Sequence, residues 1–362
     1  MSNNIVDKNF EIKTAINLPD VKFYDVRSEP FEIYGLYRAK TEPQFKRMPD
    51  EIAGKMNANI QRLYLNTAGG RVRFCTDSAY VAIHAEFTEV GRHSHMTLAN
   101  DAGFDLYEDS PTDGSSRYVK AFLPPYNITD SYESKIDLNG RKLRYFTINF
   151  PPYSSVKNLY IGLQADAFAG EGAKYRNKRP VLYYGSSITQ GACASRPGNI
   201  YENMISRSLG IDYINLGFSG NGRAEDVIVD YMNTIDMSVF VADYDHNAPN
   251  AEYLEKTALN MYKKIRAGHP DVPYIMLSRP DFDADYDQSV LRRNAVINVY
   301  RYAREQGDDN VYYIDGEGIF RGDFEDSCTV DKVHPNDLGF AYMSKAIECE
   351  IKRAMVKKSI LD

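Results

Sequence analysis

The second half of the chain alternates short apolar runs with longer amphipathic segments, and this alternation constrains the fold more than any other feature. The apolar runs lie at residues 180–184, 211–214, 237–242, 272–277 and 311–314. Each run precedes a segment with the apolar spacing and length of a helix, and these segments lie at residues 200–209, 225–235, 251–267, 289–304 and 337–355. Strands that alternate with helices form a mainly parallel sheet with helices on both faces. We therefore expect an α/β domain with three layers, α/β/α, over residues 175–362.

The first half of the chain has a different pattern. Its apolar runs are short and β-like, as at residues 80–87, 118–123 and 143–150, and clusters of Gly, Pro, Asn and Asp separate them. This spacing is typical of a β-sandwich or jelly roll, and Asn139-Gly140 is a hairpin signal. Residues 165–178 contain glycines and several charges, which indicates a linker. Because 362 residues exceed what one core usually organises, we predict a β-sandwich domain over residues 1–174 ahead of the α/β domain.

The composition excludes several classes of protein. Hydrophobic residues make up 43% of the chain and charged residues 26%, as in ordinary globular proteins. The net charge of −7 argues against a nucleic-acid partner, because binding phosphates requires a basic surface. Residues 1–10 lack the apolar core of a signal peptide, and no run reaches the roughly 18 apolar residues that span a bilayer. We therefore expect a cytoplasmic protein that does not bind a membrane.

A serine stands where the first strand of the α/β domain should end. The run at residues 180–184 stops at Gly185, and Ser186-Ser187-Ile188-Thr189 follows. Open α/β sheets bind their ligands at the carboxyl ends of strands, so Ser187 is a candidate nucleophile. A Gly-Ser-Ser segment is also a common polar turn, and the motif alone does not decide between the two interpretations.

A base and a carboxylate occur near the end of the chain, in Asp331-Lys332-Val333-His334. A serine hydroxyl becomes a good nucleophile when an imidazole removes its proton, and an anion on the other ring nitrogen fixes the imidazole tautomer. In a turn, Asp331 and His334 are close enough to interact. Together with Ser187 they complete a candidate catalytic triad.

Two other strand ends offer hydrogen-bond donors. Residues 215–220 read Asn-Leu-Gly-Phe-Ser-Gly, and residues 243–247 read Asp-Tyr-Asp-His-Asn. A glycine allows its backbone N–H to approach a reacting carbonyl closely, and an asparagine amide supplies a second donor to a developing oxyanion.

These four blocks, in this order, resemble the SGNH (GDSL-type) hydrolase superfamily from about residue 178 onward. The resemblance implies that Ser187 is the nucleophile, that Asp331 and His334 complete the triad, and that Gly220 and Asn247 join the Ser187 amide in the oxyanion hole. The chain departs from the family pattern at Ser186, where an Asp is usual, and at residues 243–247, which replace Gly-x-Asn-Asp. The α/β-hydrolase elbow Gly-x-Ser-x-Gly does not fit, because Thr189 stands where it requires glycine.

The first half carries a second resemblance. Gly103-Phe104-Asp105-Leu106-Tyr107 matches the Gly-x-Asp-Leu-Tyr signature of a β-rich domain found ahead of some SGNH esterases, and the segment at residues 71–78 is similar to the strand before it. Such two-domain proteins resemble carbohydrate O-acetylesterases, including carbohydrate esterase family 17, which acts on 2-O-acetylated mannan. The resemblance implies that the β-domain contacts carbohydrate.

Several polar residues are candidates for contacting a substrate. A solvated loop, or a hydrogen-bonded loop at a strand end, is the simpler explanation for any one of them. The candidates are Arg196, Asn199, Asp243, Tyr244, Asp245, His246 and Arg279.

No metal site is expected. His93-Ser94-His95 is half of a metal-binding pattern but has no evident third ligand in the sequence. The four cysteines are scattered and form no Cys-x-x-Cys pair, which argues against both zinc and a disulfide framework. They are Cys75, Cys193, Cys328 and Cys349.

The expected reaction is removal of an acetyl group from an oligosaccharide through an acetyl-enzyme, without a cofactor. A carbohydrate-binding protein with an inactive hydrolase domain is one alternative, and a lipase or other acyl esterase is another. The expected partner is an acetylated oligosaccharide, and a homodimer is compatible with the sequence.

Overall fold

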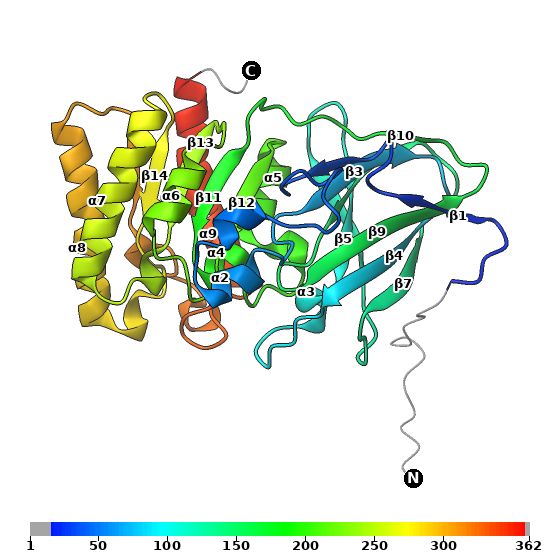
Figure 1. Cartoon of the computed structure of the whole chain (residues 1–362), viewed down its shortest axis with the longest axis horizontal. Helices are drawn as coiled ribbons and strands as arrows, with labels where there is room; N and C mark the ends of the chain where they lie inside the picture. The colour runs from blue at the N-terminus through cyan, green and yellow to red at the C-terminus, as the bar shows by residue number, and fades with distance from the viewer. Residues whose placement is uncertain (1–15, 359–362) are drawn as a thin grey trace, which may run out of the picture.

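The computed structural model describes residues 16–358 and has two parts (Figure 1). Antiparallel sheets form the first part, and a parallel sheet covered by helices forms the second. Residues 1–10, on which the expectation of a cytoplasmic protein partly rested, lie outside the described residues. Among residues 16–358, the structure contains no helix that is both long enough and apolar enough to span a bilayer.

Two sheets pack face to face in the first part. The core between them holds side chains from both sheets, including Val72, Phe74, Ile83, Phe104 and Ile161. One sheet has the order β1 (Val21–Asp25), β9 (Ser155–Gln164), β4 (Tyr80–Glu89) and β7 (Ser131–Asp137). The other has the order β10 (Ala169–Glu171), β3 (Arg71–Thr76), β8 (Arg144–Asn149), β5 (Phe104–Asp109) and β6 (Ser116–Phe122), with β2 (Glu32–Tyr34) also paired to β3. The predicted β-sandwich is confirmed.

Two local expectations in this part differ from the structure. Gly140 adopts a left-handed φ of 73°, as a turn requires, but the turn connects β7 of one sheet to β8 of the other and does not close a hairpin. The expected linker contains strand β10, which pairs with β3. Turn residues specify only the local backbone, whereas burial of apolar faces selects the partner of each strand.

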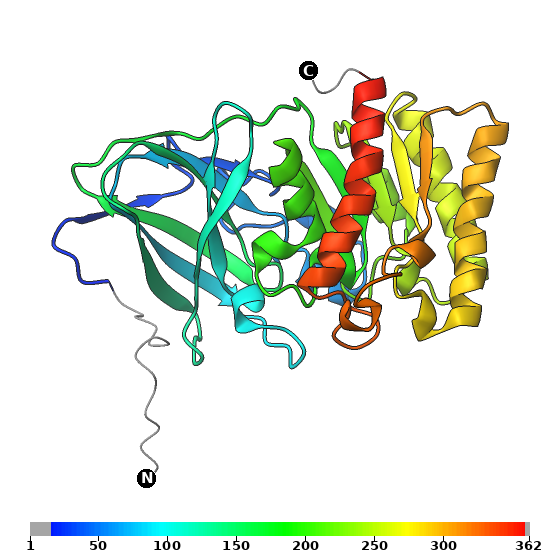
Figure 2. The same cartoon turned by 180° about the vertical axis from the view of Figure 1, so that it is seen from behind.

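The second part is built on a parallel five-stranded sheet, as predicted. Its order is β12 (Tyr213–Gly217), β11 (Val181–Gly185), β13 (Val239–Asp243), β14 (Tyr274–Leu277) and β15 (Val311–Ile314). One face packs against α6 (Asp226–Met232), α7 (Ala251–Gly268) and α8 (Tyr286–Glu305). The other face packs against α5 (Tyr201–Leu209) and α9 (Asp337–Lys357), which is red in Figure 2.

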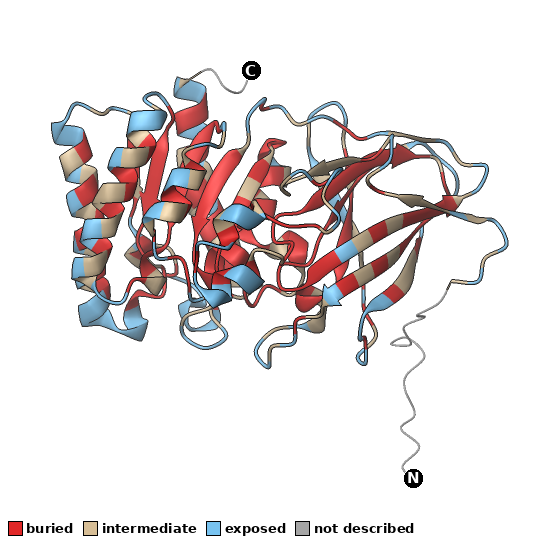
Figure 3. Ribbon diagram, viewed as in Figure 1, coloured by how far each residue is buried: buried red, intermediate tan, exposed pale blue. Residues whose placement is uncertain are grey.

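Alternating side chains of the central strands supply both cores. On β11, Leu182 and Tyr184 contact the first group of helices, while Val181 and Tyr183 contact the second. Figure 3 shows the resulting pattern, in which the strands are buried and the covering helices are exposed along their outer sides. The apolar runs are continuous, and not alternating, because both faces of the sheet are covered.

A segment from the first half of the sequence also packs on the parallel sheet. Helices α1 (Asp50–Ala53) and α2 (Ala58–Leu63) add apolar side chains to the core formed with α6. Next to them, the buried Arg47 donates hydrogen bonds to the carbonyl oxygens of Gly217 and Leu63, at 2.5 and 2.7 Å. The division at residue 174 stays a prediction.

Candidate active site

Ser187 begins the short helix α4 (Ser187–Gln190), directly after β11. The turn between them is tight, because a Cβ atom on Gly185 would lie 1.9 Å from Thr189 Oγ1 and 2.2 Å from the Asp243 carbonyl oxygen. The Ser186 hydroxyl caps α4 by accepting a hydrogen bond from the Ile188 amide at 3.1 Å. Ser187 is buried, with 8% of its surface exposed.

The three predicted triad residues lie in contact. Ser187 Oγ is 2.9 Å from His334 Nε2, and His334 Nδ1 is 2.8 Å from Asp331 Oδ2. This is the arrangement in which an imidazole takes a proton from serine while the carboxylate holds the ring and its tautomer.

The loop before α9 holds Asp331 and His334 together. Asp331 Oδ1 accepts hydrogen bonds from the amides of Val333 and His334, at 3.1 and 2.8 Å, and Lys332 between them has a left-handed φ of 71°. Partial burial by itself would raise the pKa of Asp331, but the hydrogen bonds from His334 and Val333 outweigh burial and lower that pKa. Asp331 therefore stays ionised while it orients the imidazole.

The three donors that were assigned to the oxyanion hole are unpaired among the described residues. Within residues 16–358, the backbone amides of Ser187 and Gly220 and the side-chain Nδ2 of Asn247 donate no hydrogen bond to another protein group. Asn247 Oδ1 accepts a hydrogen bond from the Gly222 amide at 3.0 Å, which leaves Nδ2 as the available donor. Gly220 has a φ of 68° and is exposed, so a ligand can approach its backbone.

Two residues that the sequence analysis did not single out support these groups. Gln190 Oε1 accepts a hydrogen bond from the Ser219 amide at 2.9 Å, and Gln190 Nε2 donates to the Pro152 carbonyl at 3.0 Å. The Tyr153 hydroxyl donates to the Ser187 carbonyl at 3.1 Å. Gln190 follows the nucleophile block directly and could have been found there, whereas Tyr153 carries no local signal.

Asp243 and Tyr244 lie beneath the site and are buried. Asp243 Oδ2 accepts hydrogen bonds from Thr189 Oγ1 and the Tyr201 hydroxyl, both at 3.2 Å. Burial raises the pKa of Asp243 to about 7. The Tyr244 ring packs against Tyr184 at a centroid distance of 5.8 Å. Both residues therefore hold the sheet edge together and are not exposed to a substrate.

His246 lies between two buried carboxylates. Its Nε2 is 2.6 Å from Asp281 Oδ1 and its Nδ1 is 3.1 Å from Asp245 Oδ1. Burial by itself would lower the pKa of His246, but Asp281 and Asp245 outweigh it and raise that pKa to about 10. The charged ring anchors the 3₁₀ turn Asp245–Asn247, which carries the candidate oxyanion donor.

Arg279 lies next to this turn. Its amide donates a hydrogen bond to Asp245 Oδ2 at 2.9 Å, and its side chain is half-buried. The structure therefore places Arg279 beside the turn Asp245–Asn247, which its amide helps to hold.

Arg196 and Asn199 are engaged in internal contacts, which explains them better than substrate binding does. Arg196 Nη1 is 2.8 Å from Asp105 Oδ2, and its guanidinium lies 3.8 Å from the centre of the Tyr118 ring. Asn199 Nδ2 donates to Asp337 Oδ2 at 2.7 Å, at the start of α9.

A histidine from the β-sandwich part lies beside the triad. The ring of His95 is 5.5 Å from the ring of His334, centre to centre. Cys193, in the turn after α4, donates a hydrogen bond from Sγ to the His95 carbonyl at 3.4 Å. The loop that carries His95 and the triad loop lie on the same side of the molecule in Figure 2.

Comparison with known proteins identifies relatives of both halves of the chain. Residues 178–352 match the model of the GDSL-like lipase/acylhydrolase family, and residues 21–168 match the model of the GxDLY domain, the N-terminus of SGNH-type esterases. Residues 178–352, which include the parallel sheet, therefore belong to the GDSL-like hydrolases. The resemblance of both halves is thereby confirmed. No curated protein sequence matched this GDSL-like hydrolase.

Solved structures share the fold along nearly the whole chain. A Bacteroides ovatus protein named a GDSL-like lipase has a TM-score of 0.81 at 27% identity, with 94% of this chain and 99% of that one covered. The salicylyl-acyltransferase SsfX3 of a tetracycline biosynthetic pathway has a TM-score of 0.74 at 18% identity, over 93% and 98%. An acetyl xylan esterase of Butyrivibrio proteoclasticus has a TM-score of 0.56 at 12% identity, over 94% and 100%.

Proposed function

We propose that this GDSL-like hydrolase is a serine esterase that removes O-acetyl groups from carbohydrate. The observation that carries the proposal is the contact chain from Ser187 through His334 to Asp331. The activity of the Butyrivibrio neighbour, an acetyl xylan esterase, supports the choice of substrate class.

The geometry supports an acyl-enzyme mechanism. His334 Nε2 takes the proton of Ser187 as Oγ attacks the ester carbonyl, and the developing oxyanion accepts hydrogen bonds from the Ser187 and Gly220 amides and from Asn247 Nδ2. His334 then gives the proton to the leaving sugar oxygen. A water molecule, deprotonated by His334, attacks the acetyl-enzyme in the same way and releases acetate.

A hollow beside the triad loop is a candidate for the sugar. It has a volume of 280 Å³ and reaches Thr329 and Lys332 on the triad loop. Phe282 and Phe320 line it together with several charged side chains. Apolar rings suit the C–H face of a sugar ring, and the polar groups beside them suit its hydroxyls.

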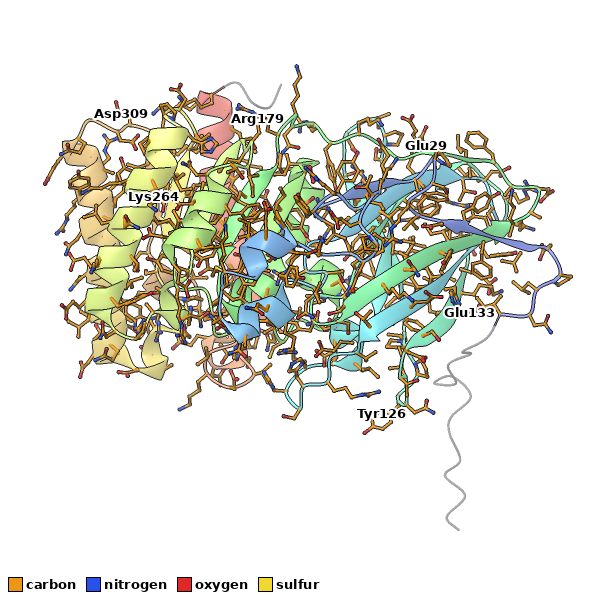
Figure 4. All side chains as sticks on the ribbon, viewed as in Figure 1. Glu29, Tyr126, Glu133, Arg179, Lys264 and Asp309 are labelled. Carbon is orange, nitrogen blue, oxygen red and sulfur yellow. The ribbon has the colours of Figure 1, made fainter. Side chains whose placement is uncertain are left out.

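The β-sandwich part supports a role in substrate choice through its position. Its loop at residues 90–97 contacts the catalytic part, since Thr97 Oγ1 donates to the Ser195 carbonyl at 2.7 Å. Tyr126, labelled in Figure 4, is 88% exposed on the same part, and Arg92 of this loop donates to its carbonyl at 2.9 Å.

The proposal is tested with acetylated mannan, xylan and chitin oligosaccharides and with an aryl acetate. We expect mass spectrometry to show loss of acetyl groups from at least one oligosaccharide, and Ser187→Ala to lower kcat by about 10⁴ or more while remaining folded. Activity on the aryl acetate alone would contradict the carbohydrate assignment. Full activity of folded Ser187→Ala would contradict the mechanism.

The acyltransferase neighbour suggests one more measurement. SsfX3 transfers a salicylyl group, so the products of the same reactions should be examined for acetyl groups moved to an added sugar alcohol. We expect acetate to be the main product. Transfer to the alcohol as the main product would replace the esterase proposal with an acyltransferase.

A further inference from the structure

Three potential metal ligands meet at the edge of the active site. His95 comes from the β-sandwich part, Cys193 from the turn after α4 and His334 from the triad loop. One ligand atom from each residue lies within 4.8 Å of the other two. The three side chains range from exposed His95 through half-buried His334 to buried Cys193, so the cluster is open to solvent on one side.

The backbone around each ligand is held in place. Cys193 has a left-handed φ of 68°, unusual for a residue with a side chain, and its Sγ lies 3.4 Å from the His95 carbonyl oxygen. The His95 loop is tied to the catalytic part by the bond from Thr97 to Ser195. Asp331 holds Nδ1 of His334, which leaves Nε2 as the ligand atom.

The chemistry of this set favours zinc. Zinc prefers imidazole nitrogen and thiolate sulfur, and a carboxylate on the far nitrogen of a histidine ligand orients the ring, as Asp331 does here. We propose that His95, Cys193 and His334 bind one zinc ion, with water as the fourth ligand. The zinc ion replaces the Cys193 thiol proton, which passes to solvent. Ligand atoms of a tetrahedral zinc site lie about 3.3–3.8 Å apart, so zinc binding requires the three side chains, which lie within 4.8 Å here, to close by up to about 1 Å.

Zinc binding and the resting triad exclude each other. His334 Nε2 is the atom that accepts the proton of Ser187, and a metal ion on that atom prevents the transfer. Zinc is therefore an inhibitor of the esterase and not its cofactor. This consequence rests on the proposed function, whereas the binding itself does not.

The binding test uses the full chain, without any substrate. Equilibrium dialysis with zinc chloride should give one tight zinc ion per chain, and His95→Gln and Cys193→Ser should each weaken it about tenfold or more. The cobalt complex of the unmodified protein should show a thiolate-to-cobalt absorption band that Cys193→Ser lacks. Cys349→Ser is the matched control, because Cys349 is the exposed cysteine among the four, and it should bind zinc like the unmodified protein.

The site would be overturned if folded His95→Gln and Cys193→Ser bound zinc as tightly as the unmodified protein. It would also be overturned if the cobalt complex of the unmodified protein lacked the thiolate band. Circular dichroism establishes that each variant is folded. Inhibition is measured separately, as the ratio of activity with zinc to activity with EDTA for each protein. If zinc binds tightly but does not inhibit ester hydrolysis, the metal site is supported and the assignment of His334 as the base is contradicted. The zinc-binding measurement remains informative even if the protein hydrolyses no ester.

Discussion

At the scale of single residues, the contact between Asp331 and His334 gives the sharpest expectation. Because Asp331 acts only by holding the His334 ring, removing the carboxylate should matter little once the ring is gone. We expect Asp331→Asn to cost no more activity than His334→Ala, and the double variant to be close to His334→Ala alone. The measurement is kcat/KM on an aryl acetate for both single variants and the double variant. Losses that multiply would show that the two residues act independently.

Asn247 offers a second test at the same scale. Its Nδ2 is aimed as a donor because its Oδ1 is held by Gly222, so Asn247→Ala should lower kcat by about 10²–10³ with little change in KM. Asn250→Ala is the matched control. The Asn250 side chain accepts a hydrogen bond from the Tyr253 amide at the start of α7, so its loss should cost about 1 kcal/mol of stability and little activity. A change in KM alone for Asn247→Ala would move this residue from the oxyanion hole to substrate binding.

At the scale of elements, the turn Asp245–Asn247 depends on a charged histidine. The pKa of His246 is raised to about 10 in the folded protein, above its ordinary value of 6.5, so its ion pairs stabilise the fold fully below about pH 6.5. That stability is lost as the pH rises toward 10. We expect the difference in free energy of unfolding between the unmodified protein and His246→Gln to shrink between pH 7.5 and 10, as measured by urea unfolding. Asp243, with a pKa near 7, titrates mainly below this window.

His269→Gln serves as the control for the same turn. The His269 ring contacts the backbone carbonyl of Asn233 at 3.1 Å, and this contact does not pair it with a carboxylate. Its difference in free energy of unfolding from the unmodified protein is measured over the same pH range for comparison. A difference for His246→Gln that stays constant between pH 7.5 and 10 would show that His246 is neutral in the folded protein.

At the scale of the whole molecule, Asp105 of the Gly-x-Asp-Leu-Tyr signature joins the β-sandwich part to the parallel-sheet part. Asp105 is fully buried, and its Oδ2 accepts hydrogen bonds from Arg196 Nη1 at 2.8 Å and from the Gly198 amide at 2.7 Å. Breaking a buried ion pair by removing one partner costs about 3–5 kcal/mol, and we expect Asp105→Ala to lose that much stability in urea unfolding. Glu108→Ala on the same strand removes a pair with the exposed Arg117 and should cost about 0–1 kcal/mol. Similar losses in both variants would contradict a joining role for Asp105.

Several individual residues show which features of the structure the local sequence predicts. The alternation of apolar runs predicted the parallel sheet, because a strand buried on both faces needs continuous apolar residues, and the spacing of Asp331 and His334 predicted their contact. Both features depend on residues close together in the chain. The tight approach at Gly185 also has a local signal, the glycine itself.

Contacts between distant segments were decided by the tertiary structure. Arg196 was a candidate for substrate binding, but packing of the two parts places it on Asp105, 91 positions earlier. Helices α1 and α2 precede most of the β-sandwich in sequence yet complete the core of the parallel sheet. His93 and His95 looked like half of a metal site without a third ligand, and folding brings Cys193 and His334 beside His95. A local pattern sets backbone conformation and the buried face, whereas the partner of that face depends on how all apolar surfaces are buried together.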